Sequence, residues 1–166
     1  MTLNKLIIPF LALSFVSAPV WALSSDKQKP VEVEADSFHL DDAKKTTTYT
    51  GNVIITQGSM EIIADKVTIY SRNGATNKVI ATGQPVKFKQ RPDGSQELIR
   101  GVSNRFEYHV PKDTLTLTNQ ATLWQAGTTF SSERIIYNSK RSIVMAGDKT
   151  SASKRVKITL EPAKDE

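Results

Sequence analysis

The side chains that most often carry catalysis are few in this 166-residue chain, and their spacing does not suit it. Cysteine is absent, which excludes thiol chemistry. The two histidines, His39 and His109, each lie between apolar residues, so both are expected to point away from the apolar face of a strand. The sequence contains no metal-ligand spacing, nucleophile elbow or phosphate-binding loop. A hydrolase is therefore disfavoured, and no catalytic residue, metal or cofactor is expected.

Acidic or amide side chains recur at regular intervals, each directly after a small residue. The small residues stand at positions 35, 64, 103 and 132, which gives steps of 29, 39 and 29 residues. The four pairs are Ala35-Asp36, Ala64-Asp65, Ser103-Asn104 and Ser132-Glu133. A calcium-binding ladder is one interpretation, but the repeat length and the lack of flanking Gly-Gly argue against it. The alternative is that these side chains bond backbone groups that a bend leaves unpaired.

The apolar pattern changes parity at each of these pairs. In "SMEIIADKVTIY", residues 59–70, the apolar residues Met60 and Ile62 are even-numbered, whereas Val67 and Ile69 are odd-numbered. A strand with one buried face keeps its apolar residues on a single parity, and a shift by one residue is typical of a β-bulge or a sheet corner. The pattern therefore predicts a bend at each acidic or amide position.

Each copy is followed by a second apolar stretch with Gly or Asn at position 51, 83, 119 or 147, which permits a kink on the return strand. Such bent hairpins can bury their inner faces only by stacking. We therefore expect an all-β fold, a folded-over β-jelly roll of stacked bent hairpins with a V-shaped section. An ordinary two-sheet sandwich of unrelated strands is the alternative. In the third copy, Asn119-Gln120 is expected to alter the local kink and leave the fold intact.

The two ends of the chain differ from the repeat region. Residues 1–22 combine Lys5, an apolar run and Val20-Trp21-Ala22, which predicts a signal peptide cleaved after Ala22, although an uncleaved membrane anchor is the rival interpretation. Residues 23–29 are expected to form a flexible N-terminus and residues 162–166 a polar tail. One domain, residues 30–161, remains.

The charge of the chain is mildly basic. The formal net charge is +5, and it becomes +4 when the signal peptide removes Lys5 and no acid. The basic residues are scattered among acidic ones and form neither an arm nor a stripe. Nucleic acid is therefore not an expected partner.

The repeats also resemble a known family. The stretch "TGNVIITQGSMEIIADKV", with "KVIATGQPVKF" further along, is similar to the OstA-like repeat of lipopolysaccharide-transport proteins, and the resemblance covers residues 29–160. It implies a jelly roll that is open at both ends. It also implies a non-enzymatic periplasmic protein that shields acyl chains inside the sheet and passes lipopolysaccharide from an inner-membrane transporter to an outer-membrane translocon.

The same resemblance implies partners. They are lipopolysaccharide through its lipid A, further copies of the chain joined head to tail, the inner-membrane-anchored OstA-like protein LptC, and the N-terminal periplasmic domain of outer-membrane LptD.

Inward-facing apolar residues are the candidates for lipid binding, because acyl-chain binding is non-directional and scales with the apolar area removed from water. A carrier of this kind requires an interior that is not packed shut along its length. The alternative for each residue taken singly is an ordinary core position. The candidates are Val31, Val33, Phe38, Leu40, Ile62, Val67, Ile69, Phe88, Phe106, Tyr108, Val110, Leu117 and Phe130.

The first and last strands are candidates for contact with partners, because an open strand edge can pair with another strand. Val31 and Val33 belong to the first strand, whereas Val156, Ile158 and Leu160 belong to the last. The alternative is a protected edge with Lys157 as its gatekeeper.

A second function also fits the composition. A structural or polysaccharide-binding β-repeat module would have a closed core and aromatic-lined outer grooves. Trp124 follows inward Leu123 and is expected to face outward, either as a partner contact or as an isolated surface aromatic. The interior therefore distinguishes the two functions.

Overall fold

A computed structural model describes residues 26–92, 95–147 and 155–162 of the chain. The expected signal peptide, residues 1–22 with cleavage after Ala22, lies outside these ranges, as do residues 163–166 of the expected polar tail. In the described ranges, no helix is long and apolar enough to cross a bilayer.

The described chain forms one antiparallel sheet with two short 3-10 helices. The strands are β1 (Glu32–Glu34), β2 (Ser37–Asp41), β3 (Thr46–Gln57), β4 (Met60–Arg72), β5 (Ala75–Gln90), β6 (Ile99–His109), β7 (Thr114–Gln125), β8 (Thr128–Asn138), β9 (Ile143–Ala146) and β10 (Lys157–Leu160). The 3-10 helices are η1 (Asp26–Gln28) and η2 (Val110–Lys112).

The strands pair almost entirely in chain order. The order across the sheet is β1-β3-β4-β5-β6-β7-β8-β10, while β2 pairs with β3 and β9 pairs with β8. β1 and β2 pair with the two halves of β3, so together they form one edge of the sheet. β9 and β10 pair with the two halves of β8 and form the other edge.

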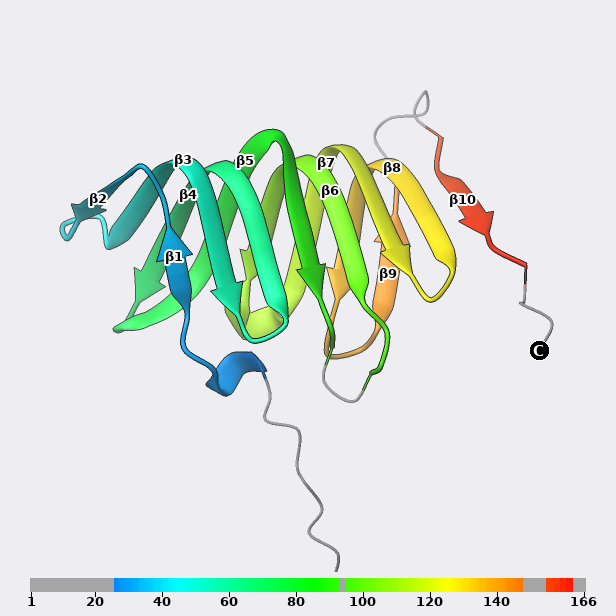
Figure 1. The fold of residues 1–166 in the computed structure, drawn as a ribbon, viewed down its shortest axis with the longest axis horizontal. Helices are drawn as coiled ribbons and strands as arrows, with labels where there is room; N and C mark the ends of the chain where they lie inside the picture. Colours follow the sequence, from blue (N-terminus) through cyan, green and yellow to red (C-terminus); the bar gives the residue numbers. More distant parts are fainter. Residues whose placement is uncertain (1–25, 93–94, 148–154, 163–166) are drawn as a thin grey trace, which may run out of the picture.

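The sheet is folded over along its middle, so each long strand contributes to two walls (Figure 1). We call the nearer half in Figure 1 the front wall, the farther half the rear wall, the bend between them the ridge, and the opposite side, where the walls end in turns, the mouth. The front wall comprises β1, β10 and residues 53–57, 60–63, 86–90, 99–103, 121–125 and 128–132. The rear wall comprises β2, β9 and residues 46–50, 66–72, 75–82, 105–109, 114–118 and 134–138. This is the V-shaped jelly roll that the repeat pattern predicted.

The predicted parity changes coincide with irregularities of strand pairing at the ridge. At three of the four predicted positions, two or three residues of one strand lie opposite a single residue of its neighbour, which is the arrangement of a β-bulge; at the fourth, Asp36, the chain passes from β1 to β2. These sets are Gly51 and Asn52 against Asp65, residues 83–85 against Asn104, and Asn119 and Gln120 against Glu133. Because each bulge adds one or two residues on one side, both halves of the paired strands present their apolar side chains to the interior.

Two of the return strands, β3 and β7, bend through residues with left-handed backbone angles. Gly51 and Asn52 have φ of 83° and 45°, and Asn119 and Gln120 have φ of 65° and 58°. The expectation that Asn119-Gln120 would alter the kink is therefore wrong, because both pairs adopt the same conformation. A left-handed φ is uncommon for Gln, so the bulge geometry overrides its local preference.

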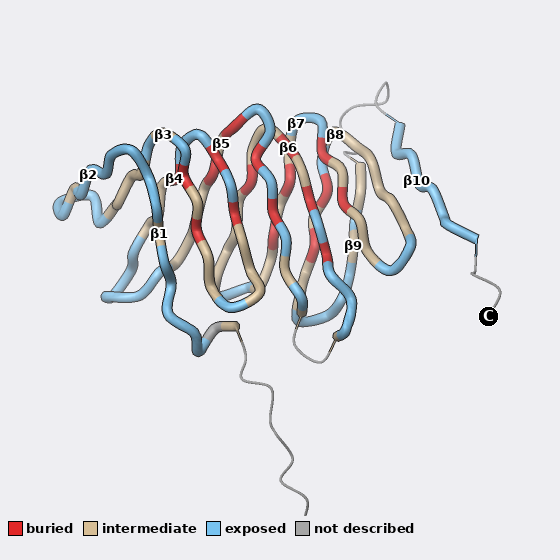
Figure 2. The backbone as a smooth tube through the Cα atoms, viewed as in Figure 1, coloured by how far each residue is buried: buried red, intermediate tan, exposed pale blue. Residues whose placement is uncertain are grey.

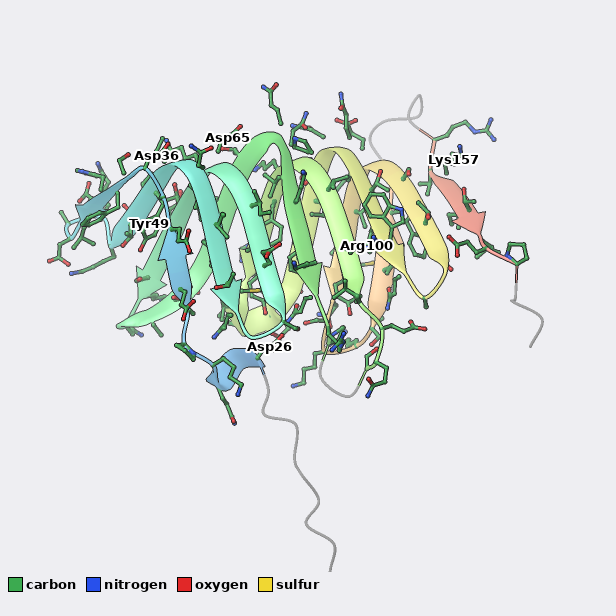
Figure 3. The ribbon with its side chains drawn as sticks, viewed as in Figure 1. Asp26, Asp36, Tyr49, Asp65, Arg100 and Lys157 are labelled. Carbon is green, nitrogen blue, oxygen red and sulfur yellow. The ribbon has the colours of Figure 1, made fainter. Side chains whose placement is uncertain are left out.

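The hydrogen bonds at the ridge agree in part with the roles expected for the acidic residues. Asp36 donates its backbone N–H to the Gly51 carbonyl over 3.0 Å and accepts a bond from the Asn52 side chain over 3.0 Å. In the third copy, the small residue Ser103 makes the bond to the backbone in place of Asn104. Its hydroxyl donates to the Arg105 carbonyl over 2.8 Å. Figure 3 shows Asp36 and Asp65 along the outer side of the ridge.

The core lies between the two walls, in the middle of the stack (Figure 2). It contains the apolar side chains that alternate along both halves of β3 to β8. The buried apolar residues are Val53, Ile55, Ile62, Ala64, Val67, Ala81, Val86, Phe88, Ile99, Phe106, Leu115, Leu117, Ala121, Leu123, Ile135 and Tyr137. The stability of the fold therefore depends on contact between the walls as well as on strand pairing.

Truncation of a central core side chain should test this dependence. Leu123 is fully buried, so Leu123→Ala should lower the free energy of unfolding by about 2–5 kcal/mol through lost burial and the cavity left behind. Met145 is an exposed apolar residue of β9, and Met145→Ala should change it by no more than about 0.5 kcal/mol. Urea titrations of both variants measure the difference, and equal losses would argue against a core between the walls.

Candidate functional site

Three continuous rows of inward-facing residues cross the sheet from one edge to the other. On the rear wall, the row nearer the mouth, which we call the mouth row, pairs in the order Leu40, Thr47, Ile69, Val79, Tyr108, Leu115, Tyr137 and Val144. The rear row nearer the ridge, the ridge row, is Phe38, Tyr49, Val67, Ala81, Phe106, Leu117, Ile135 and Ala146. The front row is Val33, Ile55, Ile62, Phe88, Gly101, Leu123, Phe130 and Ile158. The rows form one apolar lining along the length of the stack.

In the middle of the stack, the two walls pack directly against each other. The rings of Phe88 on the front wall and Phe106 on the rear wall lie 5.5 Å apart between centroids. Gly101 leaves room for a rear-wall side chain, since a Cβ there would lie 2.9 Å from Leu117 Cδ1. The void beside these residues has a volume of only ≈ 10 Å³. The interior is thus closed at its centre, whereas a carrier requires an interior that is not packed shut along its length.

At both ends of the stack, by contrast, the inward rows are uncovered. Phe38 and Leu40 are 71% and 61% exposed at the β2 edge, whereas Ile158 and Leu160 are 56% and 73% exposed at the β10 edge. These are inward positions, because Phe38 pairs with Tyr49 and Ile158 pairs with Phe130. The exposure follows from the topology, since the outermost strands have a neighbour on one side only.

The residues predicted to bind lipid are spread over three environments. Those in the closed centre are buried, namely Ile62, Val67, Phe88, Phe106 and Leu117. Those that are half-buried are Val33, Ile69, Tyr108, Val110 and Phe130, of which Val110 belongs to η2 beside the mouth. Val31, Phe38 and Leu40 are exposed at the β1–β2 edge. A ligand that touched all of them would therefore have to replace wall-to-wall contacts at the centre.

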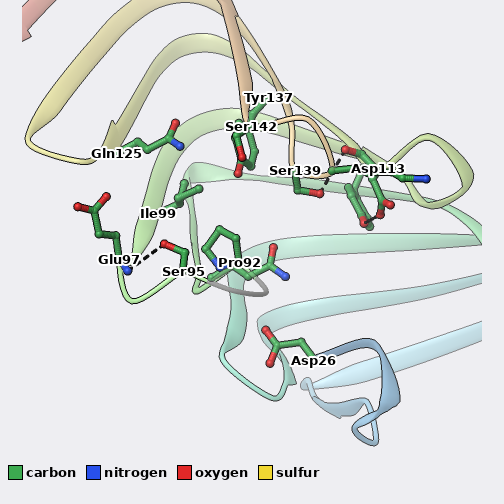
Figure 4. A pocket seen from close by; sticks show the side chains of 13 residues that line it. Asp26, Pro92, Ser95, Glu97, Ile99, Asp113, Gln125, Tyr137, Ser139 and Ser142 are labelled. Atoms are coloured by element: carbon green, nitrogen blue, oxygen red, sulfur yellow. Dashed lines mark hydrogen bonds between the residues drawn. The ribbon is translucent and has the colours of Figure 1, made fainter. Parts of the chain in front are cut away.

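The mouth contains a cavity of ≈ 610 Å³ that sequence reasoning did not find. Turns of both walls line it (Figure 4), among them residues that precede and follow β6. The residues that line it are Asp26, Gln90, Pro92, Ser95, Glu97, Ile99, Tyr108, Asp113, Gln125, Tyr137, Ser139, Lys140 and Ser142. The cavity lies where the apolar interior meets solvent, so it is the boundary between an apolar and a polar environment.

A hydrogen-bonded pair fixes the rear side of the mouth. The Tyr108 hydroxyl donates to Asp113 Oδ1 over 2.8 Å. Burial raises the pKa of Tyr108, and the hydrogen bond to Asp113 raises it further, so the phenol stays protonated. The Asp113 carbonyl in turn accepts a bond from the Ser139 backbone N–H over 3.0 Å, which ties the turn after β8 to the turn before β7.

On the front side of the mouth, η1 is attached to the turn between β3 and β4. Asp26 accepts hydrogen bonds from the Ser59 backbone N–H over 2.9 Å and from the Ser59 hydroxyl over 2.6 Å. The Gln57 side chain donates to the Lys29 carbonyl over 3.0 Å. Residues 26–29 thus make specific contacts in this structure, and their flexibility stays a prediction. The sequence offered no signal for this contact, because Asp26 and Ser59 are 33 residues apart.

Both histidines lie away from the interior. His109 Nε2 is 2.8 Å from Glu107 Oε1, and Arg105 donates to the other carboxylate oxygen over 3.2 Å. Partial burial would raise the pKa of Glu107, but these bonds outweigh it and hold the pKa below its ordinary value. His39 pairs with Thr48 on the outer face of β2 and is exposed. Across the described part of the chain, no three His, Asp or Glu side chains gather as a metal site would require.

The outer face of the front wall carries a groove of ≈ 460 Å³. Trp124 lies at one side, with the Arg100 guanidinium carbon 5.8 Å from the centre of its ring. Lys89 forms an ion pair with Glu61 over 2.9 Å at the other side. Trp124 is thus on the outer face, as the sequence pattern predicted. It lines a cationic groove and is not an isolated surface aromatic.

The first and last strands lie at the two edges of the sheet, as expected. Among the described strands, β1 and β2 pair only with β3, and β9 and β10 pair only with β8. Val33 faces inward opposite Ile55, and Ile158 faces inward opposite Phe130. Lys157 and Thr159 point to the outer face of β10 (Figure 3 labels Lys157). The outer rows of N–H and C=O groups at both edges are therefore positioned for pairing with a further strand.

Comparisons with known proteins agree with this architecture. Residues 32–143 match the protein family described as LptA/(LptD N-terminal domain) LPS transport protein. The lipopolysaccharide export system protein LptH of Pseudomonas aeruginosa is 33% identical over 154 residues, which is 89% of this chain and 88% of the relative. The LptA protein of Escherichia coli is 34% identical over 155 residues, which is 92% of this chain and 82% of the relative.

Two further matches concern an outer-membrane assembly protein and a solved structure. The LPS-assembly protein LptD of Vibrio cholerae is 37% identical over 92 residues, which is 55% of this chain and 10% of that protein. The crystal structure of Pseudomonas aeruginosa LptH, described as the LptA-homologous periplasmic component of the lipopolysaccharide transport device, superposes with a TM-score of 0.76 and 31% identity. It covers 84% of this chain and 100% of that one.

Proposed function

Because the chain belongs to the LptA/(LptD N-terminal domain) family of LPS transport proteins, we propose that it is a periplasmic, non-enzymatic carrier of lipopolysaccharide. Its role in lipopolysaccharide transport follows from the family. The specific proposal is that the acyl chains occupy the space between the front and rear walls, and that the chain hands the lipid from the inner-membrane transporter to the outer-membrane translocon.

The observation that carries this proposal is the continuity of the three inward rows. The two rear rows run from β2 to β9 and begin at the exposed Phe38 and Leu40, and the front row runs from β1 to β10 and ends at the exposed Ile158. A module that only had to be stable would cover its apolar ends. An acyl chain placed along the rows would gain about 0.8 kcal/mol for each buried methylene, so binding needs no specific polar group.

Entry of lipid requires the walls to move apart at the centre. The rings of Phe88 and Phe106 are in contact, so an acyl chain must replace that contact with contacts of its own. The strands that cross the ridge join the two described walls, and no disulfide links them because the chain has no cysteine. The replacement exchanges one apolar surface for another, which keeps its net cost small.

Self-association through the edges would extend the apolar lining from one copy to the next. A strand added at β10 would continue the front row beyond Ile158, and a strand added at the β1–β2 edge would continue the rear rows beyond Phe38 and Leu40. We propose the same edges for contact with an LptC-type protein and with the N-terminal domain of LptD. The sequence match between this chain and an LptD protein supports the proposed contact with LptD.

A polysaccharide-binding module is the second candidate. The groove with Trp124 and Arg100 on the front wall and the closed centre of the interior are the features such a module would have. The uncovered apolar ends and the family membership favour the lipid carrier. Chemical identification of the ligand that copurifies with the protein from a lipopolysaccharide-containing envelope distinguishes the two.

Photocrosslinking from inward and outward positions tests where the lipid binds. A photoreactive phenylalanine analogue at Phe88 or Tyr108 should crosslink to lipopolysaccharide, because both residues face the interior. The same analogue at the neighbouring outward positions Lys87 and Glu107 should give little product. Gel mobility and immunoblotting measure the adducts. Adducts of equal yield at all four positions would argue against an interior site.

A charge at the uncovered end of the stack tests edge association. Ile158→Asp should weaken concentration-dependent assembly roughly tenfold or more, because an added strand would bury the carboxylate in an apolar row. Thr159→Asp, which places the same charge on the outer face of β10, is the matched control and should assemble nearly as the parent does. Sedimentation velocity over a range of concentrations measures both. Equal assembly of the two variants would count against association through this end.

A further inference from the structure

We propose that the Tyr137 hydroxyl forms a subsite for acyl chains that carry a hydroxyl group close to their polar end. This inference rests on the proposed function and specifies which part of the lipid the mouth recognises. It is carried by a buried hydrogen-bonding group without a protein partner, at the boundary between the apolar interior and the mouth.

Tyr137 is almost fully buried, with 2% of its surface exposed. Its hydroxyl is inaccessible and makes no hydrogen bond to any described residue. Its neighbours in the mouth row are Leu115 and Val144, which offer no polar side chain. A buried hydroxyl without a hydrogen bond is unfavourable, because it has lost its bonds to water, unless a ligand or a water molecule completes it.

Tyr137 lies between two hollow regions of the interior. Its side chain lines both the ≈ 610 Å³ cavity at the mouth and the ≈ 10 Å³ void beside Phe88 and Phe106. That void is at the lower limit of the volume that one water needs. An acyl chain that enters between the walls from the mouth would pass this hydroxyl where it leaves the polar environment.

Tyr108, in the same row, is a tyrosine whose hydroxyl has a hydrogen-bond partner. It lies two strands away, with Leu115 between the two tyrosines, and its hydroxyl donates to Asp113. Ser132 Oγ is the other buried oxygen without a partner among the described residues, but Ser132 does not line the mouth. Tyr137 is thus the unpaired group that lines the mouth, and a ligand would reach its hydroxyl when the walls move apart.

The charges around the mouth indicate a neutral ligand group at this point. Asp26, Glu97 and Asp113 line the cavity, against the single base Lys140 among its lining residues. This balance disfavours a phosphate or carboxylate beside Tyr137. A phenol hydroxyl can donate one hydrogen bond and accept another, and a ligand hydroxyl can do the same. A hydroxylated acyl chain therefore satisfies Tyr137 better than a plain one.

The test compares two neutral probes that differ by one hydroxyl group, methyl β-hydroxydodecanoate and methyl dodecanoate. The affinity of the full chain for each is measured by displacement of a fluorescent fatty-acid analogue. The parent protein should prefer the hydroxylated ester, and Tyr137→Phe should reduce that preference about fivefold to tenfold, the effect of one lost hydrogen bond. Affinity for the plain ester should stay unchanged.

Tyr70→Phe is the matched control, because Tyr70 lies on the outer face of β4 opposite Lys78 and should leave the preference intact. Urea unfolding adds a second readout. Tyr137→Phe should keep or raise the stability of the ligand-free protein, because it removes an unpaired hydroxyl. Equal preference in parent and Tyr137→Phe protein would overturn the subsite and leave the carrier function standing. Failure of both esters to displace the analogue would overturn the subsite together with the carrier function.

Discussion

A sheet that folds back on itself must keep the same face inside through the bend, although alternate side chains of a strand point to opposite faces. The extra residues at the ridge meet this constraint, and Gly51 and Asn52 opposite Asp65 are one example. Without such a bulge, the apolar residues of one wall would turn outward. Every other feature depends on this device, because the three inward rows, the mouth and the uncovered ends exist only where both walls present their apolar faces to each other.

The interior of this protein combines the roles of core and candidate site. Contacts such as that between Phe88 and Phe106 stabilise the folded sheet, and the same surface is the one that acyl chains would cover. An ordinary core loses stability when it opens. Here the chain has no disulfide that would hold the walls together, and an apolar ligand would restore the burial that opening removes. The free energy of lipid binding and the free energy of folding therefore both depend on burial of the same apolar surface between the walls.

The sequence was sufficient for the features that depend on local alternation. The parity change at Ala64-Asp65 predicted the ridge, and the alternation of Ile158 with Lys157 and Thr159 predicted which side chains of β10 face inward. Contacts between segments far apart in the chain could not be predicted in this way. The attachment of Asp26 to Ser59 and the unpaired hydroxyl of Tyr137 depend on where turns meet in space. The closed centre was missed because alternation fixes the face of a residue and not the distance between walls.

The most direct test of this account is the distance between the two walls with and without lipid. The absence of cysteine allows spin labels to be placed at Lys87→Cys on the outer face of the front wall and Thr116→Cys on the outer face of the rear wall. Pulsed electron spin resonance then gives the distribution of distances between the labels. The account predicts that the distribution shifts to longer distances when lipopolysaccharide binds. An unchanged distribution at saturating lipid would contradict it.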